Sequence, residues 1–308
     1  MPTNATQPDE SHDDETVFSL YHYEPSFPAA VVFVALFGGS TLFHLVQIFS
    51  KKTWFFVPFF VGGCFEISGF VGRAISARET YPNYSLMPYI IQSVLLLLGP
   101  TLYAASIYML LGRLIRLLGA SKYSLIRVEH LTKYFVVGDV LSFLTLYIGG
   151  GLLAAATEKS QQDLGNNIII VGLGIQIIFF SFFMIVTCIF HYRILLTPTR
   201  HSMFLTVPWP RAILILYIAS ALIMIRSAFR MAEYVMGMDS ELQSKEVYLY
   251  VLDACLMAGV TVLYNVFHPS QVISADELAK ARGEFEGIAG EYEYSGDFVR
   301  LSSPKATP

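Results

Sequence analysis

The amino-acid sequence predicts an all-α polytopic membrane protein, a bundle of seven transmembrane helices. Hydrophobic residues make up 54% of the 308-residue chain and charged residues only 14%, which is too apolar for a soluble domain. The chain contains seven mostly apolar runs, and a run of about 20 such residues is enough to cross a hydrocarbon core of about 30 Å. The linkers between the runs are short, so we expect all seven spans to form one bundle.

The seven spans divide the chain into a membrane domain and two tails. In chain order, the predicted spans are residues 27–49, 54–76, 88–111, 134–156, 167–190, 211–233 and 247–267. The first tail is acidic and lacks the basic segment and cleavage site of a signal peptide, so we expect the first span to be the targeting signal. The regions are an extracellular or luminal tail at 1–25, a membrane domain at 26–268, and a cytosolic polar tail at 269–308 that we expect to be disordered.

The orientation follows from lysine and arginine, because positively charged short loops stay on the cytoplasmic side. The loops on one side carry ten such residues, the loops on the other side carry three, and the first tail carries none. We therefore predict an N-terminus outside the cytosol and a C-terminus inside it. Two glycosylation sequons, at Asn4 and Asn83, both fall on the predicted outer side.

Polar residues recur within the spans at helical spacing, so that they share faces of their helices. These stripes are Gly62, Glu66, Gly69 and Arg73 in the second span; Tyr89, Gln92, Gly99, Tyr103 and Ser106 in the third; Asp139, Ser142 and Gly149 in the fourth; Arg226, Arg230 and Glu233 in the sixth; and Tyr250, Asp253, Met257 and Tyr264 in the seventh. Each stripe must face protein or water, because charged groups are costly in lipid. Pro100 is expected to bend the third span.

Six of these charges fall from the middle to the outer half of the predicted bundle, three positive and three negative. They are Glu66, Arg73, Arg226, Arg230, Glu233 and Asp253. We expect the charges of the sixth span to have partners on the second and seventh spans, because pairing offsets part of the cost of burial. The network is either a structural lock or a ligand site, and its position beside Tyr, Gln and Ser residues favours a site.

The remaining charged features lie in the cytosolic half. Asp139 is predicted about one turn inside the cytosolic edge, where it snorkels to the surface, meets Arg113 or Lys133, or has a role of its own. The basic loop at 112–133 is expected to anchor on anionic lipid, with specific headgroup recognition as the alternative.

Several function classes lack the residues that their chemistry requires. The sequence has no phosphate-binding G-x-x-x-x-G-K-[ST] loop, its histidines are scattered without a metal-ligand pair, and the seventh span has no lysine for a retinal Schiff base. Cys64, Cys188 and Cys255 fall inside spans, so no outer-loop disulfide of the kind common in seven-span receptors is available. We expect no enzyme activity, no cofactor, no metal and no nucleic-acid partner. The expected partners are membrane lipids and an amphiphilic, lipid-like small molecule, with protein partners left open.

Four separated motifs, in order, resemble one known family. They are "FEISGFVGR" in the second span, "GPTLYAASIYMLLGRLI" in the third, "GDVLSFLTLYIGGG" in the fourth and "IRSAFRMAEY" in the sixth. Together they resemble the fungal RTA-like family, named for resistance to aminocholesterol and also called the lipid-translocating exporter family. The resemblance covers roughly residues 18–270. It implies a seven-span fungal membrane protein linked to release of sphingoid bases, to tolerance of sterol analogues and drugs, or to porphyrin export.

The resemblance extends to individual polar residues of the family's motifs. The family's polar positions match Glu66, Gly69, Arg73, Asp139, Ser142, Gly149, Gly150, Gly151, Arg226, Arg230, Glu233 and Asp253. One departure is Leu146, where the family motif has Gln, so that this face is less polar here and the resemblance does not establish that the ligand is the same as that of its relatives.

The expected function is ATP-independent translocation or export of amphiphiles across a fungal membrane, the plasma membrane or an endomembrane. The candidate substrates are sphingoid bases, sterol analogues, porphyrin or drugs. The alternative is a seven-span sensor or receptor-like protein that binds an amphiphile without moving it. The candidate ligand-binding or polar-network residues are Glu66, Arg73, Gln92, Tyr103, Asp139, Ser142, Arg226, Arg230, Glu233 and Asp253. Glu66 and Asp253 are expected to accept a cationic headgroup, and the arginines to keep them ionised or to bind an anionic group.

Overall fold

The computed structural model describes residues 23–79, 84–156, 158–199, 202–203, 208–236, 242 and 245–273. These residues form α1 (Phe27–Lys51), η1 (Trp54–Phe56), α2 (Val57–Ser76), α3 (Leu86–Leu117), η2 (Ser121–Tyr123), α4 (Val128–Ala155), α5 (Lys159–Leu196), α7 (Trp209–Met236), α9 (Glu246–Leu249), η3 (Tyr250–Ala254), α10 (Cys255–Val266) and η4 (Pro269–Gln271). Seven helices are long and apolar enough to cross a membrane, and the described residues include no strand. The predicted fold class, an all-α multi-pass membrane protein, is confirmed.

The helices cover the predicted spans to within one residue at the ends of the fourth and seventh, and most of them extend beyond the apolar runs. α4 begins at Val128, six residues before the predicted 134, and α5 is 38 residues long. Hydropathy detects the part of a helix that fits in lipid, whereas backbone hydrogen bonding continues into the polar flanks. The seventh span is one helical run, α9–η3–α10, in which η3 is a π-helical turn. Asn4, Asn83 and the tail beyond 273 lie outside the described residues.

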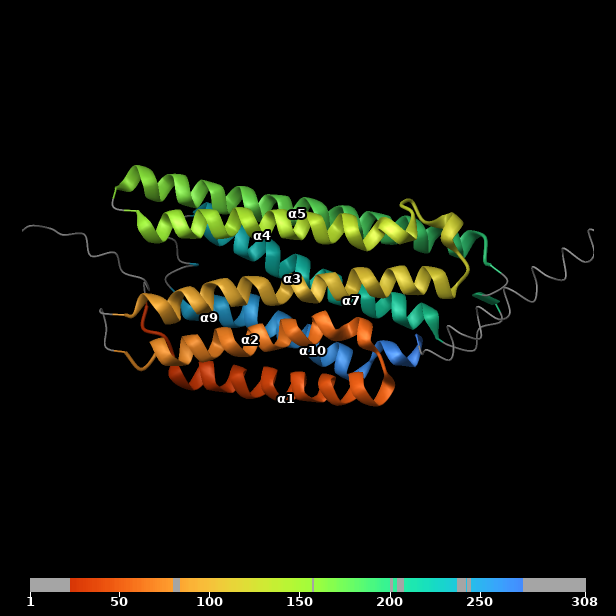
Figure 1. The fold of residues 1–308 in the computed structure, drawn as a ribbon, viewed down its shortest axis with the longest axis horizontal. Helices are drawn as coiled ribbons and strands as arrows, with labels where there is room; N and C mark the ends of the chain where they lie inside the picture. Colours follow the sequence, from red (N-terminus) through yellow and green to blue (C-terminus); the bar gives the residue numbers. More distant parts are fainter. Residues whose placement is uncertain are drawn as a thin grey trace, which may run out of the picture.

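Helix α3 runs through the middle of the bundle, with α1 and α2 on one side of it and α4 and α5 on the other (Figure 1). The seventh span packs against α1 and α7. The start of α1 and the end of α10 lie at opposite ends of the bundle (Figure 1). We call the end where α1 begins the N-end and the end where α10 finishes the C-end.

The exterior of the bundle carries many exposed apolar side chains, and several charged residues of the spans are buried inside it. Leu42, Ile178 and Tyr147 are each more than 60% exposed on the surface, whereas Arg73 and Arg226 are completely buried. This distribution is the reverse of that in a soluble protein and suits a bundle surrounded by lipid tails.

The small residues of α4 form a close contact with α5. Ser142 Oγ donates a hydrogen bond to the carbonyl oxygen of Gly172 at 2.7 Å. A Cβ added at Gly149 would lie 2.9 Å from the Gly165 carbonyl oxygen, which is closer than real Cβ atoms approach. The predicted stripe of Ser142 and Gly149 therefore packs helix against helix, as small residues do in membrane bundles.

Adjacent glycines provide a matched test of this packing. We expect Gly149→Ala to destabilise the protein by about 1–3 kcal/mol, because the added methyl group meets the α5 backbone. Gly150→Ala is the control, because a Cβ there has no atom within 4 Å and the gain in helix propensity is the same. Thermal unfolding in detergent measures both variants, and equal midpoints would show that the α4–α5 contact tolerates a methyl group.

The predicted orientation is tested by labelling both ends of the chain. We expect a tag after residue 5 to be accessible only from outside the cell or from the lumen, and a tag after residue 305 only from the cytosol. Protease protection in sealed vesicles measures each tag separately. Accessibility of both tags from the same side would contradict the seven-span topology, and reversed accessibility would contradict the orientation.

Candidate ligand site in the buried charge network

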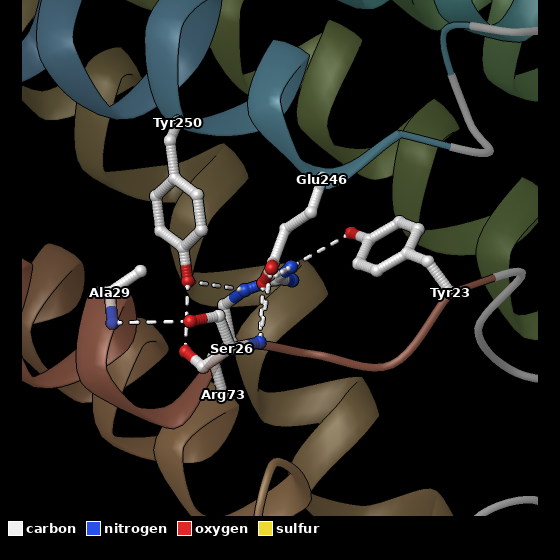
Figure 2. Close-up of polar contacts among 6 residues, drawn as sticks. All are labelled: Tyr23, Ser26, Ala29, Arg73, Glu246 and Tyr250. Atoms are coloured by element: carbon white, nitrogen blue, oxygen red, sulfur yellow. Dashed lines mark hydrogen bonds and ion pairs between the residues drawn. The ribbon is translucent and has the colours of Figure 1, made fainter.

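A guanidinium group at the N-end joins three parts of the chain. Arg73, near the end of α2, donates from Nη2 to Glu246 Oε1 at 2.7 Å and to the Tyr23 hydroxyl at 2.8 Å. Its Nε donates to the Tyr250 hydroxyl at 3.1 Å. The Glu246 carboxylate also accepts two hydrogen bonds from the backbone nitrogen of Ser26, the residue that caps α1. Figure 2 shows the Arg73 side chain at the centre of these groups. We call Tyr23, Arg73, Glu246 and Tyr250 the N-end cluster.

A second ion pair lies near the end of α7. Arg230 Nη1 donates to Glu233 Oε2 at 2.8 Å, and the Arg230 guanidinium lies 5.6 Å from the ring centre of Tyr234. Both charged side chains are about nine-tenths buried. The spacing of three residues on one helix allows this pair to form without a neighbouring helix.

Deeper in the bundle, Arg226 connects α7 to the seventh span and to α3. Its Nε donates to Asp253 Oδ1 at 2.7 Å, and its Nη2 donates to the carbonyl oxygen of Leu96 at 2.7 Å. Asp253 lies in the π-helical turn η3, a local widening of the helix that is often found at functional sites.

The Leu96 carbonyl is available because of the residue four positions later. In a regular helix that carbonyl accepts from the N–H of residue 100, but Pro100 has no N–H. α3 continues through Pro100, and Arg226 supplies the missing hydrogen bond. The proline thus creates a buried acceptor for a charged side chain of another helix.

One carboxylate beside this ion pair has an unused oxygen. Glu66 of α2 is 1% exposed, and it lies within electrostatic range of both Arg226 and Asp253. Its Oε1 has no hydrogen-bond partner among the described residues, and the nearby Tyr103 hydroxyl has none either. Gly99 leaves room for the carboxylate, because a Cβ there would lie 2.7 Å from Glu66 Oε1. Buried polar atoms without partners are rare and indicate a missing ligand or water.

We call Glu66, Tyr103, Arg226 and Asp253, with the Leu96 carbonyl, the mid-depth cluster. Glu66 lies ten residues before the end of α2, or about 15 Å along the helix axis from the N-end. The N-end cluster, the Arg230–Glu233 pair and the mid-depth cluster therefore form a series of buried polar groups from one end of the bundle to about its middle.

The expected pairing of the charges is partly confirmed. The predicted partner of Arg226 on the seventh span is present as Asp253. The expectation of a partner on another span is wrong for Arg230, which pairs with Glu233 of its own helix. Arg73 pairs with Glu246, a residue that sequence reasoning missed because it precedes the apolar run. The signal for it was its position, four residues before Tyr250 on the predicted stripe.

Three other predicted residues lie away from the mid-depth cluster. Gln92 is buried where α3 packs against Gly72 of α2, and Ser142 bonds to α5. Asp139 lies eleven residues, or about three turns, after the start of α4, because α4 begins six residues before the predicted apolar run. Neither Arg113 nor Lys133 pairs with it in the described chain.

A comparison with protein families matches residues 59–276 to the family described as "RTA1 like protein". The chain belongs to the RTA1-like family. The matched segment runs from the third residue of α2 to beyond the end of the seventh span, and so contains the whole mid-depth cluster. The family identity expected from the four sequence motifs is confirmed.

Relatives of this RTA1-like protein occur in Saccharomyces cerevisiae. It is 34% identical to "Protoporphyrin uptake protein 1" over 287 residues, covering 81% of this chain and 91% of the relative. It is 34% identical to "Protein RTA1" over 277 residues, covering 82% and 85%. It is 27% identical to "Sphingoid long-chain base transporter RSB1" over 279 residues, covering 80% and 72%. No solved structure matches the chain.

At the level of the family, these findings support lipid-related transport in a membrane.

Proposed function

We propose that this RTA1-like protein moves amphiphilic, lipid-like molecules across a fungal membrane without ATP and without catalysing a covalent reaction. The observation that carries the proposal is Glu66 Oε1, which has no partner within the described residues and lies beside the Arg226–Asp253 pair at about the middle of the bundle. Transporters commonly bind their substrates at mid-depth, and ionisable residues inside a membrane bundle mark substrate pathways.

The chemistry of the mid-depth cluster suits headgroups of either charge. The carboxylate of Glu66 can accept hydrogen bonds from the ammonium group of a sphingoid base. Arg226 Nη1, which has no partner among the described residues, can donate a hydrogen bond to a carboxylate of a porphyrin. Relatives named for sphingoid long-chain base transport and for protoporphyrin uptake support both substrate classes. We place the protein in the plasma membrane, where an exporter of such amphiphiles would act.

A reconstituted translocation assay tests the proposal. Purified protein in vesicles is supplied with a labelled sphingoid base, a sterol amine and a porphyrin, and movement between leaflets is followed. We expect at least one of them to move faster than in protein-free vesicles. Glu66→Gln should lower the rate for the cationic molecules about 10-fold or more, because the amide oxygen still accepts a hydrogen bond but lacks the negative charge that strengthens it.

The control is Glu129→Gln, which removes an exposed carboxylate at the start of α4. We expect its translocation rates to equal those of the wild type. Saturable binding without movement would identify a sensor instead of a translocator. If neither binding nor movement is found for any of the three molecules, the proposed substrate class is wrong.

A further inference from the structure

Asp139 is a buried carboxyl group that the mid-depth cluster does not use. It is 3% exposed and lies on α4, packed on the side of α3 that carries Tyr108, whereas Glu66 lies near Tyr103. Five residues separate the two tyrosines, so they project from different faces of α3. Asp139 thus belongs to a separate place in the bundle, nearer the C-end.

The side chain beside Asp139 is Tyr108, which belongs to a cluster of aromatic rings. Tyr108 interacts with the Asp139 carboxyl group, although the two do not reach the geometry of a regular hydrogen bond. The Tyr108 ring lies 4.6 Å from the ring centre of Phe183 and 5.3 Å from that of Phe135. Both phenylalanines are completely buried. The carboxyl group therefore lies beside a tyrosine whose ring is packed among buried aromatic side chains.

No positive charge balances this carboxyl group in the described part of the chain. On α3, Arg113 lies over the ring of Phe55, with 4.3 Å between the guanidinium carbon and the ring centre. On α4, Lys133 is exposed. On α5, no titratable group interacts with Asp139 among the described residues, and Tyr108 is the one such group of α3 that does.

An ionised carboxylate in such a place has lost its water without gaining a counter-ion. That state costs several kcal/mol, and a buried acid avoids the cost by binding a proton. The contrast with Asp253 is direct, because Asp253 has Arg226 as a partner at 2.7 Å.

We propose that Asp139 is a proton-binding site, which holds a proton in this conformation and releases it when the bundle rearranges to admit water. On release the carboxyl O–H bond breaks, its electron pair remains on the carboxylate oxygen, and the proton passes to water. Rebinding of a proton allows the residue to return to its apolar surroundings. The role in transport rests on the proposed function, whereas the bound proton does not.

Infrared spectroscopy of the purified protein near neutral pH tests the bound proton. A protonated carboxylic acid has a carbonyl stretching band that a carboxylate lacks. We expect Asp139→Asn to remove one such band, and Tyr108→Phe to shift it because the hydroxyl nearby is lost. The exposed-site control Glu129→Gln should remove none. Asn has the size of protonated Asp, so we expect this variant to fold; loss of no acid band in folded Asp139→Asn protein would overturn the proposal.

Translocation of the labelled sphingoid base in vesicles with and without a pH gradient tests the release. We expect the gradient to change the wild-type rate, and the ratio of the two rates to become one in Asp139→Asn. A gradient response that persists in this variant would overturn the proposal, as would a wild type that transports without any response. If the wild type moves none of the three test molecules, the proposed function fails, and the infrared band still decides whether Asp139 holds a proton.

Discussion

Arg226→Ala is expected to remove most of the folded protein. The substitution leaves the Asp253 carboxylate buried without its counter-ion and the Leu96 carbonyl without a donor. Breaking a buried ion pair by removing one partner costs about 3–5 kcal/mol, which is a large part of the stability of most proteins. Fluorescence-detected size-exclusion chromatography of detergent extracts measures the amount of folded protein. A normal yield of monodisperse Arg226→Ala protein would contradict the structural importance of this pair.

Replacing both partners separates stability from function. Arg226→Met combined with Asp253→Leu removes both charges and keeps apolar volume, which is often neutral or stabilising for a buried ion pair. We expect the double variant to recover most of the folded protein that Arg226→Ala loses. If the pair is part of the substrate site, the recovered protein does not translocate amphiphiles. If translocation recovers with abundance, the pair is a structural lock and the site hypothesis for Arg226 and Asp253 is wrong.

Arg73→Ala is expected to have the second-largest effect, because the side chains of Tyr23, Glu246 and Tyr250 each lose a hydrogen-bond donor. The variant removes the donors that Arg73 supplies to Glu246 and to the hydroxyls of Tyr23 and Tyr250, whereas Glu246 keeps the hydrogen bonds from the Ser26 backbone nitrogen. Arg73 is completely buried and Glu246 is 16% exposed, so water compensates one partner in part. We expect a loss of about 3 kcal/mol, at the lower end of values for broken buried pairs.

Thermal unfolding in detergent measures this loss, and a nearby arginine provides the control. Arg78 is exposed two residues past the end of α2, where its guanidinium lies over the ring of Phe27. Arg78→Ala should cost only about 0.5–1 kcal/mol, the value of an exposed cation–π contact. Equal unfolding midpoints for the two variants would show that the N-end cluster contributes no more than a surface contact. Arg73→Lys should lie between them, because lysine keeps the charge but cannot make all the bonds of the fork.

Most of the fold could be predicted from the sequence, because the membrane imposes one requirement on every span. Backbone groups must be satisfied within the span, so about 20 apolar residues predict a helix with little ambiguity. The helix ends were less predictable, since hydropathy follows the lipid boundary and not the backbone hydrogen bonds. For Asp139 this difference means that the helix starts about three turns before it, although the apolar run starts only about one turn before it.

The candidate site was predictable where it depends on side-chain spacing. The spacing of Arg226, Arg230 and Glu233 places them on one face. The balance of buried charges predicted a partner on the seventh span for Arg226, and Asp253 is that partner. Neither argument distinguishes a pair between helices from a pair within one helix, which is why the prediction for Arg230 failed. Backbone acceptors are invisible to such patterns, yet the carbonyl four residues before a proline is a general signal, and here it identifies Leu96. The π-helical turn at Asp253 had no sequence signal that we recognised.

The order of these residues along the chain has a consequence for biosynthesis. Arg73 and Arg226 are translated well before Glu246 and Asp253, which both belong to the last span. Each arginine must therefore enter the membrane before its counter-ion has been made, and the insertion machinery, water or lipid headgroups must hold it until then. A chain released before its final helix is made retains two arginines inside the membrane without their carboxylate partners. These unpaired charges distinguish incomplete chains from finished protein, and quality-control proteins could recognise them.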